Sequence, residues 1–200
     1  MAINQKKTDA QGFDRRSATY ENSRRQGYIF DRVQKIVLDL AENGKKPECV
    51  LDVGCGTGRL LRKANKIWPD ARLIGVDPAQ GMIKQANQLL SDGEFHVAMA
   101  ESLPLSDASV DLVFSTMSFH HWTNQAKSLI EIARVLRPQG RFLLADIMMP
   151  PGLSLIFRHF KRNSPTKTRG MFAKAGLNVE FQHRPWRWSR ILVITSGKKA

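Results

Sequence analysis

The sequence predicts an α/β protein with a doubly wound, mostly parallel sheet and an antiparallel hairpin at one edge. Short apolar runs alternate with helical patterns from residue 48 onward. Most of these runs lack polar alternation, which is typical of parallel strands covered on both faces. The last two runs stand close enough along the chain to pair as a hairpin, so one strand is expected to run against the others.

The elements are expected in a regular order. Apolar residues recur at helical spacing over 28–44, where Gly44 is a plausible end. The expected strands are 48–53, 71–76, 94–99, 110–115 and 141–147, and the helices between them are 58–68, 79–90 and 124–136. The hairpin strands are expected in 176–184 and 189–198.

The length of 200 residues is consistent with one domain and short appendages. We expect a loose polar segment at 1–17 and a single domain over 18–200 that contains a short basic insertion at 150–167. No apolar run approaches the roughly 20 residues that a membrane helix needs. The first residues lack an apolar signal region, so a cytoplasmic location is expected.

The cysteines and the charge distribution limit the kinds of site that the chain is expected to form. Cys49 and Cys55 are the only cysteines and have no neighbours at metal-ligand spacing, so neither a metal site nor a disulfide is expected. The net charge of +13 is uneven, because residues 51–150 hold ten basic and ten acidic side chains. Residues 151–200 hold 11 basic side chains against one acid, so the basic character is local.

The stretch VLDVGCGTGRL places Gly54, Gly56 and Gly58 between a strand and a helix. Bare backbone there lets a ligand approach closely, and the first amides of the helix can donate to a negative group. Asp77 ends the next strand, 77 − 58 = 19 residues after Gly58, where an acid can accept from ribose hydroxyls. A nucleotide-containing cofactor is expected. The third glycine comes one place too early for a dinucleotide motif, and Arg59 stands in its place.

Several motifs in order resemble those of class I S-adenosylmethionine-dependent methyltransferases, especially the small-molecule branch typified by quinone-biosynthesis C-methyltransferases. They are LDVGCGTG, GVDPAQGM, AESLPLSDASVDLVFS, FHHW and VLRPQGRFLLADI. The resemblance implies a Rossmann-like, seven-stranded sheet with its last strand antiparallel, and S-adenosyl-L-methionine as cofactor. It also implies cofactor contacts for Asp52, Gly54 and Gly56 (methionine part), Asp77 (ribose), Pro78 and Leu103 (adenine faces), Ala100 (amide to the ring) and Ser115 (carbonyl near the ammonium).

Two positions depart from the family pattern. Met99 stands where Asp or Asn usually accepts from the adenine amine, so either Glu101 or water replaces that acceptor or the cofactor binds more weakly. Gln139 replaces a glycine in the turn at 138–140.

Methyl transfer from a sulfonium is an in-line displacement that needs alignment more than acid or base chemistry. His120 and His121 are candidates for a general base, and Trp122 could contact the substrate. The alternative is that one histidine caps this segment and Trp122 anchors it in the core.

The basic end of the chain is the expected acceptor side. With the implied topology, the N-terminal stretch near Tyr20 to Tyr28 and the insertion are also expected to rise at the substrate side. Arg184, Trp186, Arg187 and Trp188, with the insertion, could form the acceptor site. A small-molecule or lipid-like acceptor is the main hypothesis. The alternatives for residues 151–190 are an anionic membrane surface, RNA, or a merely solvated face. A catalytically inactive, cofactor-binding sensor or partner subunit is a further alternative.

Overall fold

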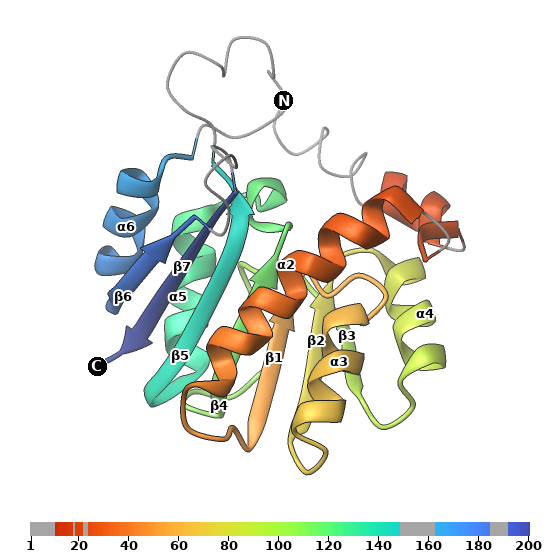
Figure 1. The fold of residues 1–200 in the computed structure, drawn as a ribbon, viewed down its shortest axis with the longest axis horizontal. Coiled ribbons are helices and arrows are strands. Elements are labelled where there is room, and N and C mark those ends of the chain that lie inside the picture. Colours follow the sequence, from red (N-terminus) through yellow and green to blue (C-terminus); the bar gives the residue numbers. More distant parts are fainter. Residues whose placement is uncertain (1–10, 18, 22–23, 149–162, 185–191) are drawn as a thin grey trace, which may run out of the picture.

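A computed structural model of the chain describes residues 11–17, 19–21, 24–148, 163–184 and 192–200. Seven strands form one sheet in the order β3-β2-β1-β4-β5-β7-β6 (Figure 1). They are β1 (Cys49–Val53), β2 (Arg72–Asp77), β3 (Glu94–Val97), β4 (Val110–Thr116), β5 (Leu136–Ile147), β6 (Leu177–His183) and β7 (Leu192–Lys199). Strands β1 to β5 are parallel, and β7 is antiparallel to both β5 and β6. The predicted doubly wound sheet with a C-terminal hairpin at one edge is confirmed.

Helices cover both faces of this sheet. In Figure 1, α2 (Arg24–Glu42) and α3 (Arg59–Ile67) lie in front of the sheet, and α5 (Gln125–Val135) lies behind it. The apolar residues of α2 and α3 form one buried cluster with the sheet, and those of α5 and α6 (Pro165–Lys174) form the other. Every residue of β1 is buried, which explains why its sequence lacks polar alternation. No helix among the described residues is both long and apolar enough to cross a bilayer.

The N-terminal segment differs from the loose chain expected over 1–17, because residues 11–17 are helical. The Asp14 carboxylate accepts a hydrogen bond of 2.7 Å from the backbone N–H of Gly81, in the first turn of α4 (Gln80–Leu89). A carboxylate is favoured at a helix N-terminus, so this tertiary contact helps to hold a polar segment in place. Most of the insertion expected at 150–167 lies outside the described residues, and α6 begins at Pro165.

The turn at 138–140 is part of β5, which begins directly after α5. Gln139 has a φ of 66°, a left-handed conformation that glycine adopts without strain and glutamine does not. The departure noted in the sequence therefore falls at the residue where the backbone favours glycine.

Candidate functional site

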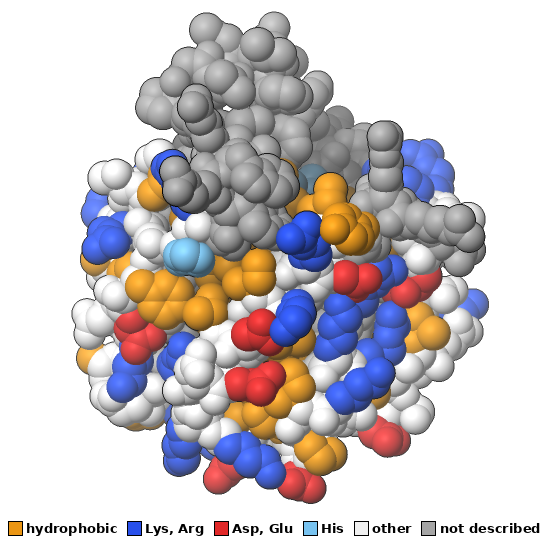
Figure 2. Space-filling view, viewed as in Figure 1, with side chains coloured by type: hydrophobic (Ala, Val, Ile, Leu, Met, Phe, Trp, Pro, Cys, Tyr) orange, Lys and Arg blue, Asp and Glu red, His pale blue; other side chains and the backbone are white. Residues whose placement is uncertain are grey.

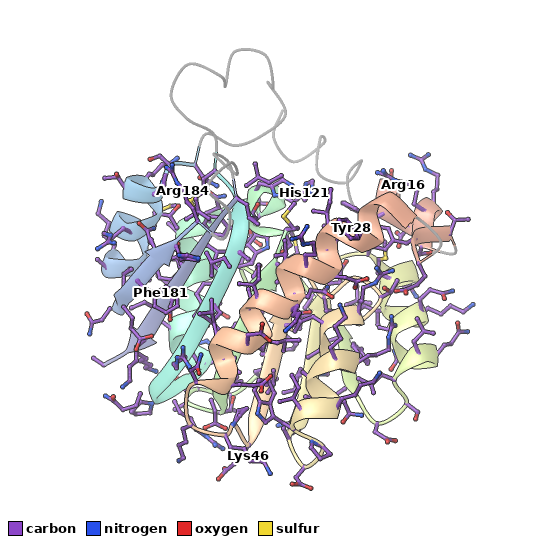
Figure 3. The ribbon with its side chains drawn as sticks, in the orientation of Figure 1. Arg16, Tyr28, Lys46, His121, Phe181 and Arg184 are labelled. Carbon is purple, nitrogen blue, oxygen red and sulfur yellow. The ribbon has the colours of Figure 1, made fainter. Side chains whose placement is uncertain are left out.

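A pocket of about 590 Å³ opens at the carboxyl ends of β1, β2 and β4. Ligand sites of doubly wound sheets lie at this end of the strands. Figure 3 places His121, Tyr28 and Arg16 at this end of the molecule and Lys46 at the opposite end. The described lining is Phe13, Tyr20, Phe30, Gln34, Asp52–Thr57, Arg59, Val76–Pro78, Met82, Val97–Glu101, Thr116–Ser118 and His121–Thr123.

The glycine loop between β1 and α3 has the open backbone that the sequence predicts. Gly54, Gly56 and Gly58 all have positive φ angles, of 81°, 53° and 75°. A Cβ on Gly54 would lie 2.3 Å from the Ser118 hydroxyl oxygen, whereas a Cβ on Gly56 would meet nothing within 4 Å. Gly56 thus presents open space to the pocket, where a ligand can approach the main chain.

Asp77, at the end of β2, fastens this loop. Its Oδ2 accepts a hydrogen bond from the Gly56 N–H at 3.0 Å, and its Oδ1 accepts one from the Ala79 N–H at 2.9 Å. Each carboxylate oxygen keeps a second lone pair that can accept from a ribose hydroxyl. Burial raises the pKa of Asp77 to about 6, against the lowering effect of the two N–H donors. The carboxylate is therefore ionised at neutral pH.

Asp52 lies deeper, with 2% of its surface exposed. Its Oδ1 has no hydrogen-bond partner among the described residues. Burial, and secondarily the negative charge of Asp77, raises the pKa of Asp52 to about 8. A buried carboxylate oxygen without a donor is costly, so this atom calls for a ligand group that donates a hydrogen bond or carries positive charge.

The residues expected around adenine are only partly brought together. Pro78, Ala100 and Glu101 line the pocket. Met99 lines it too and is 46% exposed, and the Glu101 carboxylate accepts from the Asn124 N–H at 2.6 Å. Leu103 is buried in the core and is not among the described lining residues.

Ser115 also lies behind the pocket, with its hydroxyl 2.8 Å from that of Ser118, which itself lines the cavity. The side chain of Ser115 is fully buried. Ser118 also donates to the carbonyl of Val53 at 2.9 Å, which ties β4 to β1 beneath the glycine loop.

The two histidines occupy different environments. His120 is buried, with Nδ1 2.6 Å from Asp146 Oδ1, and its backbone N–H donates to Asp146 Oδ2 at 3.0 Å. His121 lines the pocket, where its ring meets the edge of Phe13 at 5.4 Å between centroids. Trp122 also lines the pocket, although it is 7% exposed and packs on the Phe119 ring. Of the two candidate bases, only His121 is placed to reach a ligand directly.

The N-terminal stretch expected at the substrate side contributes Tyr20 to the lining, whereas Phe13 lies outside that stretch and was missed. Phe13 and Tyr20 line the pocket, and they are seven residues apart in an otherwise polar segment. This spacing places two aromatic rings on one helical face, which is the signal that could have identified Phe13. Phe30, from α2, adds a third aromatic ring to the lining.

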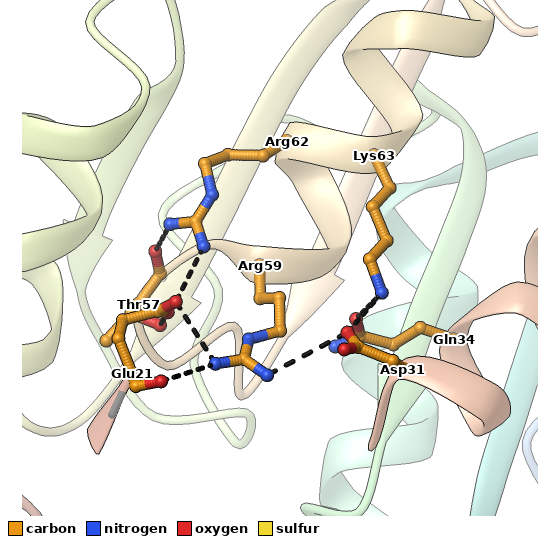
Figure 4. A network of polar contacts seen from close by, with 7 residues as sticks. All are labelled: Glu21, Asp31, Gln34, Thr57, Arg59, Arg62 and Lys63. Carbon is orange, nitrogen blue, oxygen red and sulfur yellow. Dashed lines mark hydrogen bonds and ion pairs between the residues drawn. The ribbon is translucent and has the colours of Figure 1, made fainter. Parts of the chain in front are cut away.

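Glu21 holds this aromatic segment against the helix that follows the glycine loop (Figure 4). Its carboxylate accepts from the Thr57 hydroxyl, from Arg59 at 3.1 Å and from Arg62 at 3.0 Å. Arg59 also lies 3.8 Å from Asp31, and Lys63 bonds Asp31 as well. These pairs neutralise the one arginine or lysine among the described lining residues, Arg59.

The basic C-terminal residues do not contribute to the described lining. Arg184 is exposed and lies beyond β6, while Trp186, Arg187 and Trp188 lie outside the described residues. No group of three or more potential metal ligands occurs in the described part of the chain.

The glycine loop gives a matched pair of tests. Gly56→Ala is expected to cost about 1–2 kcal/mol of stability, from its left-handed φ, and to abolish cofactor binding because the methyl group fills the open space. Gly54→Ala adds a clash with Ser118, so it is expected to lower stability more. Urea unfolding measures the first effect and calorimetry the second. Tight cofactor binding by Gly56→Ala would contradict the placement of the ligand.

Comparisons with known proteins agree with this geometry. Residues 51–144 match the family model of the methyltransferase domain. The chain is 32% identical over 119 residues to a demethylmenaquinone methyltransferase of Thermotoga maritima, covering 60% of this chain and 50% of that protein. It is 34% identical over 145 residues to a malonyl-(acyl-carrier protein) O-methyltransferase of Hahella chejuensis, covering 70% of this chain and 49% of that protein. The chain thus spans about half the length of these relatives.

The fold is shared with a solved SAM-dependent methyltransferase from Aquifex aeolicus. The two structures superpose with a TM-score of 0.71 at 22% identity, over 91% of this chain and 96% of the other. The match over residues 51–144 and the shared fold agree with the class I, S-adenosylmethionine-dependent methyltransferase domain that the sequence motifs resemble.

Proposed function

We propose that the protein transfers a methyl group from S-adenosylmethionine to a small-molecule or lipid-like acceptor. The observation that carries the proposal is the combination of the open backbone at Gly56 with the carboxylates of Asp52 and Asp77 at one end of the pocket. These groups fit the cofactor, since they offer a cradle without a side chain, acceptors for hydroxyl groups and a buried carboxylate oxygen that has no hydrogen-bond partner in the part of the chain that the structure describes. The cofactor supplies an electrophilic methyl group and a neutral leaving group.

The protein contributes alignment and exclusion of water. Asp77 and the glycine loop hold the nucleoside part of the ligand, and Asp52 offers negative charge to its cationic part. Phe13, Tyr20 and Trp122 line the pocket and give the acceptor an aromatic, water-poor environment. His121 is placed to accept a proton where the acceptor atom is a hydroxyl or an activated carbon.

The aromatic lining favours an uncharged or apolar acceptor over a phosphate-rich one. Figure 2 shows Lys and Arg side chains interspersed with Asp and Glu on the face that α2 and α3 cover. Several of these cations are paired, as in Lys35–Asp39 and Lys63–Asp31. No feature of the described residues favours RNA or membrane contact over a small acceptor.

Calorimetry with Asp77→Ala tests the cofactor site. Loss of a hydrogen-bonding carboxylate is expected to weaken S-adenosylmethionine binding roughly 10- to 150-fold, and NAD should not bind the parent protein. Asp70→Ala is the matched control, because Asp70 is exposed and pairs with Lys46 at the surface. Equal affinity of Asp77→Ala and the parent would overturn the assignment.

An assay of product formation tests whether the protein is an enzyme. Formation of S-adenosylhomocysteine in the presence of quinols, phenols or acyl carboxylates distinguishes an enzyme from a cofactor-binding sensor. His121→Gln is expected to reduce turnover of hydroxyl acceptors without changing cofactor affinity.

A further inference from the structure

The cofactor end of the pocket carries more negative charge than the described protein around it compensates. Asp52 and Asp77 both line it, and the negative charge of Asp77 disfavours a negative charge on Asp52. The other ionisable lining groups are Cys55 and Arg59 from the loop and α3, Tyr20 from the N-terminal segment, and Glu101 and His121 from the loops after β3 and β4. Arg59 is committed to Glu21 and Asp31, so it does not offer its charge to Asp52.

Asp52 differs from Asp77 in its hydrogen bonds. Asp77 accepts from two backbone N–H groups, whereas Asp52 has one oxygen with no donor among the described residues. The ionised form of a carboxylate that is buried with one oxygen lacking a donor is costly until a cation enters the pocket.

The cofactor of a methyltransferase and the product formed from it differ in net charge. S-adenosylmethionine carries a sulfonium, an ammonium and a carboxylate, which sum to one positive charge. S-adenosylhomocysteine has lost the methyl group and with it the sulfonium charge, and its net charge is zero. Both ligands keep the ammonium, so the sulfonium charge is the feature through which a buried acid can respond differently to the two.

We propose that Asp52 discriminates between the cationic cofactor and its net-neutral product. Asp52 releases a proton when the sulfonium enters the pocket and recovers one when the sulfonium charge is lost. The proposal rests on the proposed function, because it takes these two molecules as the ligands of the pocket. Each cofactor molecule bound to the acid form of Asp52 sends one proton to solvent. Loss of the sulfonium charge returns a proton from solvent to Asp52, and the product is then held without the charge attraction.

The raised pKa of Asp52 agrees with proton release on cofactor binding. Because burial and Asp77 raise its pKa to about 8, the acid form predominates at neutral pH before a cation binds. A cation beside the carboxylate lowers the pKa again, so binding and proton release are linked.

Calorimetry of both ligands between pH 6.5 and 9, in buffers of different ionisation enthalpy, tests the proposal. Up to one proton per bound S-adenosylmethionine is expected near pH 7, and fewer for S-adenosylhomocysteine. The ratio of the two affinities should move toward the cofactor by at most about tenfold per pH unit and level off above about pH 8. The amino group is common to both ligands, so the effect of its ionisation on the two affinities cancels in their ratio. Sinefungin, which carries an amine in place of the sulfonium, should follow the cofactor.

Two variants show whether Asp52 or Asp77 causes the pH dependence of the affinity ratio. In Asp52→Asn the affinity ratio should no longer depend on pH, and the extra proton release should disappear. Asp77→Asn should weaken both ligands and keep the pH dependence, but with a lower midpoint, because the negative charge of Asp77 helps to raise the pKa of Asp52. Circular dichroism checks that each variant is folded.

The outcomes are distinct. A ratio independent of pH in the parent, or unchanged pH dependence in Asp52→Asn, would overturn the role of Asp52 while the proposed function stands. Failure of both ligands to bind the folded parent would instead overturn the proposed function.

Discussion

Asp146→Ala is expected to lower the free energy of unfolding by about 2–6 kcal/mol, at about 1–3 kcal/mol for each of two buried donors that lose their acceptor. Asp146 is 1% exposed at the end of β5, and its carboxylate contacts both the ring and the backbone N–H of His120. Alanine would leave two polar groups of His120 buried without their partner. It would also release the short 3-10 helix η1 (Phe119–His121), which presents His121 to the pocket.

Urea unfolding with matched variants measures this effect. Asp146→Asn keeps an acceptor of the same shape and should cost less than alanine. Asp107→Ala is the surface control, since Asp107 pairs with Arg134 while 78% of its side chain is exposed. That change is expected to stay within about 1 kcal/mol. A loss of similar size in Asp107→Ala and Asp146→Ala would show that the buried pair contributes nothing special.

Asp52→Asn is expected to stabilise the ligand-free protein at pH 8 while weakening its hold on the cofactor. The pKa of Asp52 is about 8 in the folded state, against 3.8 for an unperturbed aspartate. Between these values the folded protein binds a proton that the unfolded chain has released, so the free energy of unfolding falls as pH rises. At roughly 1.4 kcal/mol per pKa unit, the full loss is at most about 6 kcal/mol. Asparagine has the same shape and cannot ionise, so the Asp52→Asn variant does not suffer this loss of stability.

Unfolding experiments at several pH values isolate this group. Asp77 acts with the same sign, but its pKa of about 6 confines its effect to lower pH. The slope between pH 6.5 and 8 therefore reports mainly on Asp52 among these two acids. Parallel pH profiles for the parent and Asp52→Asn would contradict the buried, uncompensated acid that the pocket geometry indicates.

The sequence by itself determined the sheet and the cofactor class, and it placed the core of the proposed cofactor site. The glycine loop and Asp77 follow consecutive parallel strands, and the carboxyl ends of such strands meet at one edge by construction. Local spacing was therefore enough to place Gly54, Gly56 and Asp77 together. The departure at Gln139 was also visible, because a left-handed turn residue is a local property.

Only the tertiary structure decided how the pocket is closed and which histidine faces it. Asp146 meets His120 across 26 residues of chain, and Glu21 meets Arg59 across 38. Neither partner carries a local pattern that specifies the other, because a carboxylate can pair with any cation or N–H donor that packing brings near. The helix at 11–17 was missed for the same reason. Its composition is polar, and contacts such as that of Asp14 with α4, far along the chain, help to hold it in place.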